Sequence, residues 1–283
     1  MPFFPSLLLR CLAHLPLAAL HRLGSVLGWA IYGMSPTYRR HLRENLAAAR
    51  YDDARLRRRA IAAAGQLVME LPALWFRPPD KVLALVKEVH GEAAVLAAQR
   101  AGKAILFLTP HMGAFEVAAQ YAATRIPITV IYRRPKLTWL EPLMRAGRER
   151  PNVRLVSADL RGVREVFKAL ERGEAVGFLP DQVPGPGEGE WSDFFGRPAY
   201  TMTLAAKLAA RDNVASFLAF AKRLPRGAGY SILVQPFAPA RPGESATRRL
   251  NRALEELVAL CPEQYLWGYN RYKTPKGAKP PPA

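Results

Sequence analysis

The sequence has few of the residues that build disulfide or metal sites. Its 283 residues include only two cysteines, Cys11 and Cys261, and neither belongs to a Cys-x-x-Cys pair. This indicates neither a disulfide framework nor a cysteine-based zinc site, and it fits a reduced, cytosolic setting. The five histidines are scattered without ligand spacing. We therefore expect no metal and no cofactor.

Long unbroken apolar runs are also missing. A membrane-spanning helix needs about 20 consecutive apolar residues, and the apolar N-terminus is interrupted at Arg10, Pro16 and Arg22. No basic stretch precedes it and no clear cleavage site follows, so we do not expect a cleaved signal peptide. We expect residues 1–38 to be a helical segment that lies in a membrane interface or forms a marginal anchor. The alternative is an ordinary buried N-terminal helix.

Acidic residues are scarce relative to basic ones. The chain has 23 Asp and Glu against 41 Lys and Arg, a net charge of +18. Such a surface attracts phosphate, whether in nucleic acid, anionic lipid or an acidic partner. Arginines crowd the stretch just after the apolar N-terminus, which marks a cytoplasmic face and attracts anionic lipid. A nucleic-acid-binding protein needs a basic reading helix or a stacking sheet, and neither is visible, so we expect no nucleic-acid partner.

The middle of the chain alternates between two apolar patterns. Short apolar runs typical of buried strands exchange with amphipathic stretches typical of helices, which predicts an α/β fold with a mainly parallel central sheet flanked by helices. We expect this domain to cover residues 39–275 and the tail 276–283 to be disordered. A Gly- and Pro-rich stretch, 177–199, predicts a long loop. The predicted strands are 103–110, 126–133, 152–158, 174–182, 214–224 and 230–237. The predicted helices are 115–125, 137–150, 160–173, 201–210 and 245–260.

Polar side chains follow three of the predicted strands. His111 comes after the first, the stretch "YRRPK" (132–136) after the second, and "PDQ" (180–182) after the fourth. Active sites of open α/β sheets form at the carboxyl ends of the strands. We therefore expect these three groups to converge on one site.

His111 and Glu116 are spaced as a general base and the carboxylate that orients it. Two residues five apart on one helix point about 140° apart, so they meet only if His111 lies on the turn before the helix. Pro110 and Gly113 favour such a turn. The alternative is a capping turn without chemistry.

The arginines of "YRRPK" suggest phosphate binding. Guanidinium groups suit phosphate oxygens, often through two parallel hydrogen bonds. Arg133 and Arg134 are the candidates. The alternative is a solvated basic turn, which a chain this basic must have somewhere.

Taken in order, the motifs resemble a known family. The stretches "PHMGAFE", "IYRRPK", "AGRER", "FLPDQ", "FFGRPA" and "PEQYLWGYNRYK" are similar to those of the late acyltransferases of lipid A biosynthesis, with a glycerolipid acyltransferase-like fold. The resemblance implies an enzyme on the cytoplasmic face of the inner membrane. It implies transfer of a fatty acyl group from acyl carrier protein to a hydroxyl of a phosphorylated lipid A precursor, beside anionic lipids.

The resemblance also implies roles for particular residues. Its catalytic dyad falls on His111 and Glu116. The residues that we expect to bind substrate are Arg133, Arg134, Arg148, Asp181 and Gln182. His111 takes the hydroxyl proton as attack on the thioester proceeds, and Glu116 holds the imidazole, without an acyl-enzyme.

Two other functions fit part of the pattern. The same catalyst could act on another lipid acceptor, such as a lysophospholipid, a mannosylated lipid or an aminolipid, with acyl-CoA as donor. A non-catalytic membrane scaffold is the other, and the intact dyad disfavours it.

Overall fold

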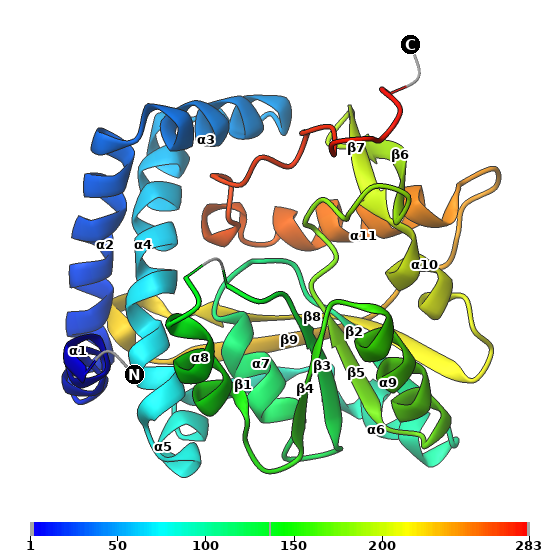
Figure 1. Cartoon of the computed structure of the whole chain (residues 1–283), viewed down its shortest axis with the longest axis horizontal. Helices are drawn as coiled ribbons and strands as arrows, with labels where there is room; N and C mark the ends of the chain where they lie inside the picture. Colours follow the sequence, from blue (N-terminus) through cyan, green and yellow to red (C-terminus); the bar gives the residue numbers. More distant parts are fainter. Residues whose placement is uncertain (1–2, 136, 282–283) are drawn as a thin grey trace.

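The computed structural model describes residues 3–135 and 137–281 (Figure 1). The first two residues of the expected membrane segment, Lys136 of the basic turn and the last two residues of the tail therefore lie outside the described residues.

A seven-stranded sheet forms the centre of the protein, in the order β1-β9-β8-β2-β5-β3-β4. All neighbouring pairs are parallel except β8 and β9. The predicted α/β fold with a mainly parallel sheet is confirmed. The strands are β1 (Val86–His90), β2 (Ala104–Leu108), β3 (Ile128–Tyr132), β4 (Val153–Ser157), β5 (Ala175–Phe178), β8 (Val214–Arg223) and β9 (Tyr230–Pro236).

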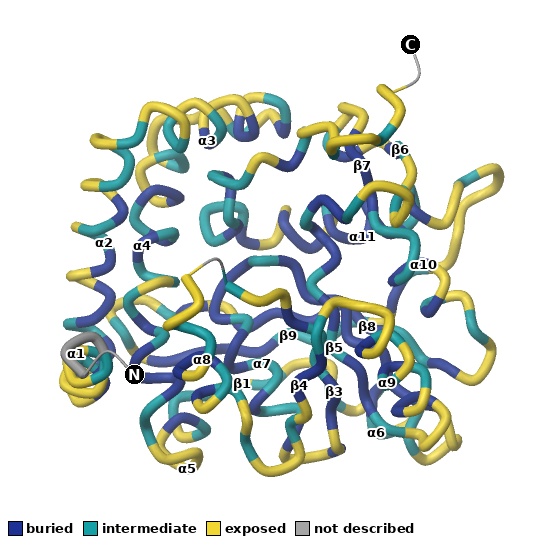
Figure 2. Tube along the Cα trace, viewed as in Figure 1, coloured by how far each residue is buried: buried dark blue, intermediate teal, exposed yellow. Residues whose placement is uncertain are grey.

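Helices cover both faces of this sheet, so its central strands are buried (Figure 2). On β2, Leu106 and Leu108 pack in one apolar cluster with α9 to α11, while Ile105 and Phe107 pack in another with α6. A strand buried on both faces has no polar side to alternate with, which explains the run "AILFL". The helices are α5 (Pro79–Leu83), α6 (Glu92–Arg100), α7 (Phe115–Ala122), α8 (Leu140–Arg148), α9 (Leu160–Glu171), α10 (Thr203–Ala209) and α11 (Ala246–Ala259), with short 3₁₀ turns at Pro225–Gly227 and Pro262–Gln264.

The N-terminal quarter is helical: α1 (Phe3–Ala13), α2 (Leu17–Met34), α3 (Pro36–Ala48) and α4 (Ala54–Phe76). Helices α2 and α4 lie side by side at one end of the molecule (Figure 1). Their backbones approach closely because the crossing is made of glycine: a Cβ on Gly28 would lie 2.1 Å from the Ile61 oxygen, and one on Gly65 1.9 Å from the Gly24 oxygen. Within the described residues, no helix combines the length and apolar character needed to cross a membrane.

A β-hairpin occupies part of the stretch that we predicted as a loop. Strands β6 (Gly189–Phe194) and β7 (Arg197–Met202) pair antiparallel. The two residues between them, Phe195 and Gly196, both have positive φ, 50° and 72°, as a tight two-residue hairpin turn requires. The prediction was wrong here because the preceding Gly-Pro run obscured two short strands and the turn begins with phenylalanine rather than asparagine.

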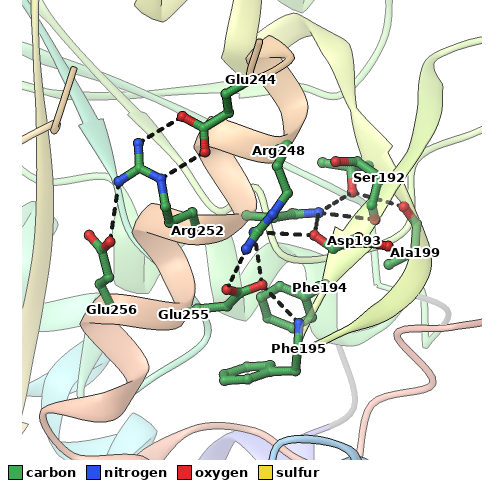
Figure 3. Close-up of polar contacts among 12 residues, drawn as sticks. Ser192, Asp193, Phe194, Phe195, Ala199, Glu244, Arg248, Arg252, Glu255 and Glu256 are labelled. Carbon is green, nitrogen blue, oxygen red and sulfur yellow. Dashed lines mark hydrogen bonds and ion pairs between the residues drawn. The ribbon is translucent and has the colours of Figure 1, made fainter. Parts of the chain in front are cut away.

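Helix α11 holds this hairpin in place (Figure 3). The Glu255 carboxylate accepts a hydrogen bond of 2.8 Å from the Phe195 backbone N–H and two of 3.0 Å from Arg248. One turn further along, Arg252 lies between Glu244 and Glu256. The hairpin is thus fixed by hydrogen bonds to charged groups, which are stronger than neutral ones.

Candidate active site

His111 lies on the turn between β2 and α7, at the carboxyl edge of the sheet. Gly113 has a φ of +57° and sits so close to β8 that a Cβ would lie 2.1 Å from the Ala221 oxygen. The C-terminal segment also holds the turn: Gly113 N–H donates to the Gln264 oxygen, and Leu266 N–H donates to the His111 oxygen, each at 3.0 Å. The turn before the helix that we predicted for His111 is confirmed.

Asp181 is the carboxylate that contacts His111. Its two oxygens lie 2.8 Å from the ring Nδ1 and 2.9 Å from the His111 backbone nitrogen. Burial raises the pKa of Asp181, but the charge of His111 and the hydrogen bonds from His111 outweigh this and hold the pKa below its usual value. An ionised Asp181 requires a proton on Nδ1, so the neutral ring presents the lone pair of Nε2.

Glu116 does not make the contact that we expected. It lies in the first turn of α7, almost fully buried, and binds the guanidinium of Arg148 on α8, with Nε 2.8 and 3.0 Å from its two oxygens. The order of the strands explains why Asp181, and not Glu116, contacts the ring. Strand β5 is the direct neighbour of β2, so Asp181, just after β5, reaches Nδ1 from across the sheet.

Gln182 faces the other ring nitrogen. Its side-chain nitrogen lies 3.1 Å from His111 Nε2. Because Asp181 keeps the proton on Nδ1, Nε2 accepts and the Gln182 amide N–H donates. The Phe115 ring meets the imidazole edge to face, with the centroids 5.3 Å apart. Two consecutive residues after β5 therefore bind the two nitrogens of one imidazole.

An open cavity of about 290 Å³ lies in front of His111. Five of the seven predicted site residues line it: His111, Glu116, Arg133, Arg148 and Gln182. Asp181 lies behind the imidazole and is 3% exposed. Arg134 is different, because its side chain is 74% exposed and its Nε lies 3.4 Å from Glu141. The structure thus brings six of the predicted residues together and leaves Arg134 at the surface.

A second, apolar cavity of about 60 Å³ adjoins the first. The two share wall residues, among them Phe115, Val130 and Leu179. The apolar cavity is lined by α6, α7 and one face of the sheet, including Val95 and Phe107. A space walled by aliphatic and aromatic side chains, joined to a polar one with a histidine, suits a molecule with a long apolar part and a reactive polar end.

Comparison with known proteins identifies the family of the chain. The profile of the bacterial lipid A biosynthesis acyltransferase family matches residues 2–274. The chain belongs to this family. It is 27% identical to the lipid A biosynthesis lauroyltransferase of Escherichia coli strain K12, over 93% of this chain and 88% of the relative. The palmitoleoyltransferase of the same strain is 26% identical, over 74% and 69%, and its myristoyltransferase is 24% identical, over 76% and 67%. The protein is an O-acyltransferase.

The acyltransferase also has a buried ion network that the sequence did not reveal. Arg223 of β8 binds Glu70 of α4 at 2.8–3.0 Å, and it donates to the Gly113 oxygen at 2.7 Å. His21 of α2 lies 3.1 Å from the same carboxylate. Burial raises the pKa of Glu70, but the charge of Arg223 and these hydrogen bonds hold it below its usual value. The network joins the N-terminal helices to the His111 turn, through residues that no local pattern marks.

Proposed function

We propose that the protein moves a fatty acyl group from acyl carrier protein to a hydroxyl of a phosphorylated lipid A precursor. One observation carries this proposal: His111, whose Nδ1 is bound by Asp181, lines a polar cavity that adjoins the apolar one. A base at the junction of a polar and an apolar space can meet both the acceptor hydroxyl and the thioester at the head of an acyl chain. Names of the relatives, all lipid A biosynthesis transferases, support the acceptor class.

His111 acts as the general base in this proposal. Its Nε2 takes the proton of the acceptor hydroxyl as the oxygen attacks the thioester carbonyl, a contribution of about 10²–10⁴ in rate. Asp181 keeps the other proton on Nδ1 and stabilises the imidazolium that forms. The imidazolium then protonates the departing thiolate. Direct attack by the acceptor needs no acyl-enzyme.

Glu116 and Arg148 form a second polar group on the cavity wall. Glu116 is held within the wall, and its two-pronged contact fixes the direction of the Arg148 guanidinium. We assign Glu116 the role of positioning Arg148, which in turn lies against the acceptor. This replaces the ring-holding role that the spacing to His111 suggested.

Arg133 is the phosphate ligand in this proposal. It lines the cavity, and among the described residues it has no ion-pair partner. A guanidinium that is not neutralised by a carboxylate can offer its fork to a phosphate. The net charge of +18 adds a long-range attraction for the phosphorylated acceptor, for anionic lipid and for an acidic carrier protein.

The outer face of α2 is the membrane contact that we propose. Leu23, Val26 and Trp29 are exposed and recur every three residues, so they share one side of the helix, and Met34 at its end is exposed as well. Leu7 and Leu8 of α1 are exposed as well. Apolar side chains with a tryptophan, next to an arginine-rich stretch, are typical of a helix lying in a bilayer interface. We place this face on the cytoplasmic side of the inner membrane.

An acyl-transfer assay on His111→Ala tests the catalytic proposal. With acyl carrier protein thioester and a phosphorylated lipid A precursor, we expect at least a hundredfold loss of turnover with an unchanged melting temperature. His90→Ala is the matched control, because His90 pairs with Glu88 at the exposed strand β1. A folded His111→Ala protein with turnover within about tenfold of wild type would show that His111 is not the general base.

A further inference from the structure

The base nitrogen of His111 already has a hydrogen-bond donor within the protein. Gln182 holds its amide nitrogen 3.1 Å from Nε2. A general base must approach the hydroxyl that it deprotonates to about 2.6–3.2 Å. The acceptor hydroxyl therefore has to occupy the position that the Gln182 amide now fills, so the amide must move before reaction.

The residues on both sides of Gln182 are held in place, so its side chain is the part of this residue that can move. The residue before it, Asp181, is fixed by two contacts with His111. The residue after it, Val183, donates its backbone N–H to the Tyr269 hydroxyl at 3.0 Å. Rotation about the side-chain bonds of Gln182 can carry the amide aside while its backbone stays beside the reacting centre.

The backbone N–H groups on the turn that carries His111 are already engaged. The N–H groups from His111 to Ala114 donate, in order, to Asp181, to Pro110, to Gln264 and to Ala221. Of the two guanidinium groups that line the cavity, that of Arg148 is bound to Glu116, and that of Arg133 is assigned to the acceptor phosphate in the proposed function. The amide of Gln182 is a donor that already lies next to the base, and it becomes free when the acceptor arrives.

We propose that Gln182 caps the base nitrogen in the resting enzyme, yields this place to the acceptor hydroxyl, and then donates its amide N–H to the oxyanion. The proposal rests on the proposed function, because it assumes that His111 is the base. It makes Gln182 a catalytic residue rather than only a substrate-binding one.

Acyl transfer proceeds by addition to the thioester carbon and elimination of the carrier thiol. The acceptor oxygen forms a bond to the thioester carbon and its proton passes to Nε2. The π electron pair of the carbonyl moves to its oxygen, which accepts the hydrogen bond from Gln182. When the intermediate collapses, the C–S bond breaks and the sulfur takes the proton from the imidazolium. The products are an ester and the free thiol of the carrier.

Gln182→Met tests the oxyanion role, because methionine has a similar length and no N–H donor. In the full-length enzyme, with acyl carrier protein thioester and a phosphorylated lipid A precursor, we expect kcat to fall about 10²–10³-fold, the usual cost of losing one oxyanion donor. KM and the melting temperature should change little. Gln99→Met carries the same change on α6, at a residue that lines neither cavity, and should keep wild-type kcat.

The pH profile tests the resting cap. Asp181 faces Nδ1, and Glu116, Arg148 and Arg133 are the other charged groups on the cavity wall. A donor on Nε2 favours the unprotonated ring, so Gln182→Met should move the acid limb of kcat/KM to higher pH. If the acid limb does not move in Gln182→Met, Gln182 does not cap the base nitrogen. Wild-type kcat in Gln182→Met overturns the oxyanion role but leaves the proposed function standing, whereas an active, folded His111→Ala protein overturns both.

Discussion

Asp181 binds both the ring and the backbone of His111, through one carboxylate oxygen each, at 2.8 and 2.9 Å. One residue therefore fixes the orientation of the imidazole and the start of the turn that carries it. The contact spans 70 positions in the chain and depends on the pairing of β2 with β5.

Replacing Asp181 by asparagine should reduce turnover by about 10³–10⁴-fold, because an amide can bind the wrong tautomer and cannot stabilise the imidazolium. Glu116→Gln should cost less, since its amide oxygen can still accept a hydrogen bond from Arg148. Initial rates and thermal unfolding of both variants give the comparison. The opposite order, with Glu116→Gln inactive and Asp181→Asn active, would favour the pairing that the sequence suggested.

Enlarging Ala122 should shorten the acyl chain that the enzyme prefers. Ala122 lines the apolar cavity and does not line the polar one. In Ala122→Leu the added side chain fills part of that space, and each methylene that no longer fits costs about 0.8 kcal/mol, a factor of about four. Competition between acyl donors of different length measures the preference. The same change at the exposed Ala97 is the control. An unchanged preference in Ala122→Leu would show that the acyl chain does not bind in the apolar cavity.

Arg133→Ala should weaken the use of a phosphorylated acceptor by about 10- to 100-fold, since a hydrogen bond to a charged group is worth about 1.5–3 kcal/mol. Arg133→Lys should recover only part, because a point charge lacks the fork. Arg134→Ala removes the same charge from a side chain 74% exposed and should have a smaller effect. Equal losses on phosphorylated and dephosphorylated acceptors would show that Arg133 does not bind the phosphate.

Removing one partner of the buried Glu70–Arg223 pair should destabilise the fold. Both side chains are at most 3% exposed, so Arg223→Met leaves a buried carboxylate with only His21 and the Tyr230 hydroxyl as partners, at a cost of about 3–5 kcal/mol in the free energy of unfolding. Arg40→Met breaks the exposed pair with Glu44 and should cost no more than about 1 kcal/mol. Denaturant titration measures both. Equal costs would mean that burial does not set the strength of the inner pair.

The parts of the fold that could be predicted are those with a local signal. "AILFL" indicates a strand buried on both faces whatever surrounds it, and Pro110 and Gly113 indicate a turn before α7. The β6–β7 hairpin lacked such a signal, because its turn begins with Phe195 at positive φ, a position where asparagine or glycine is usual.

Contacts across the sheet could not be predicted, because the order of strands decides them. The spacing from His111 to Glu116 suggested a pair, yet Asp181 reaches the ring from the neighbouring strand. The Glu70–Arg223 pair joins residues 153 positions apart and has no periodic pattern around it. Convergence at the carboxyl edge, by contrast, follows from parallel strands alone, and it located four of the seven predicted residues: His111, Arg133, Asp181 and Gln182.

The last prediction concerns the outer face of α2. Changing Leu23, Val26 and Trp29 together to serine should reduce binding to vesicles of anionic phospholipid, because each apolar side chain contributes about 25 cal/mol per Å² that it buries in the interface. The opposite side of α2 packs on α4 through Gly24 and Gly28. The triple variant should therefore keep its melting temperature, whereas deleting residues 1–34 would expose α4.

Vesicle sedimentation separates this face from apolar exposure in general. Leu160 and Leu260 are also exposed, 79% and 54%, at the start of α9 and the end of α11. Their change to serine is the matched control and should leave binding near wild type. If the α2 variant sediments with vesicles as wild type does, α2 does not carry the membrane contact. If it loses binding but keeps turnover on acceptor dispersed in detergent, the helix serves attachment and the site beside His111 works without it.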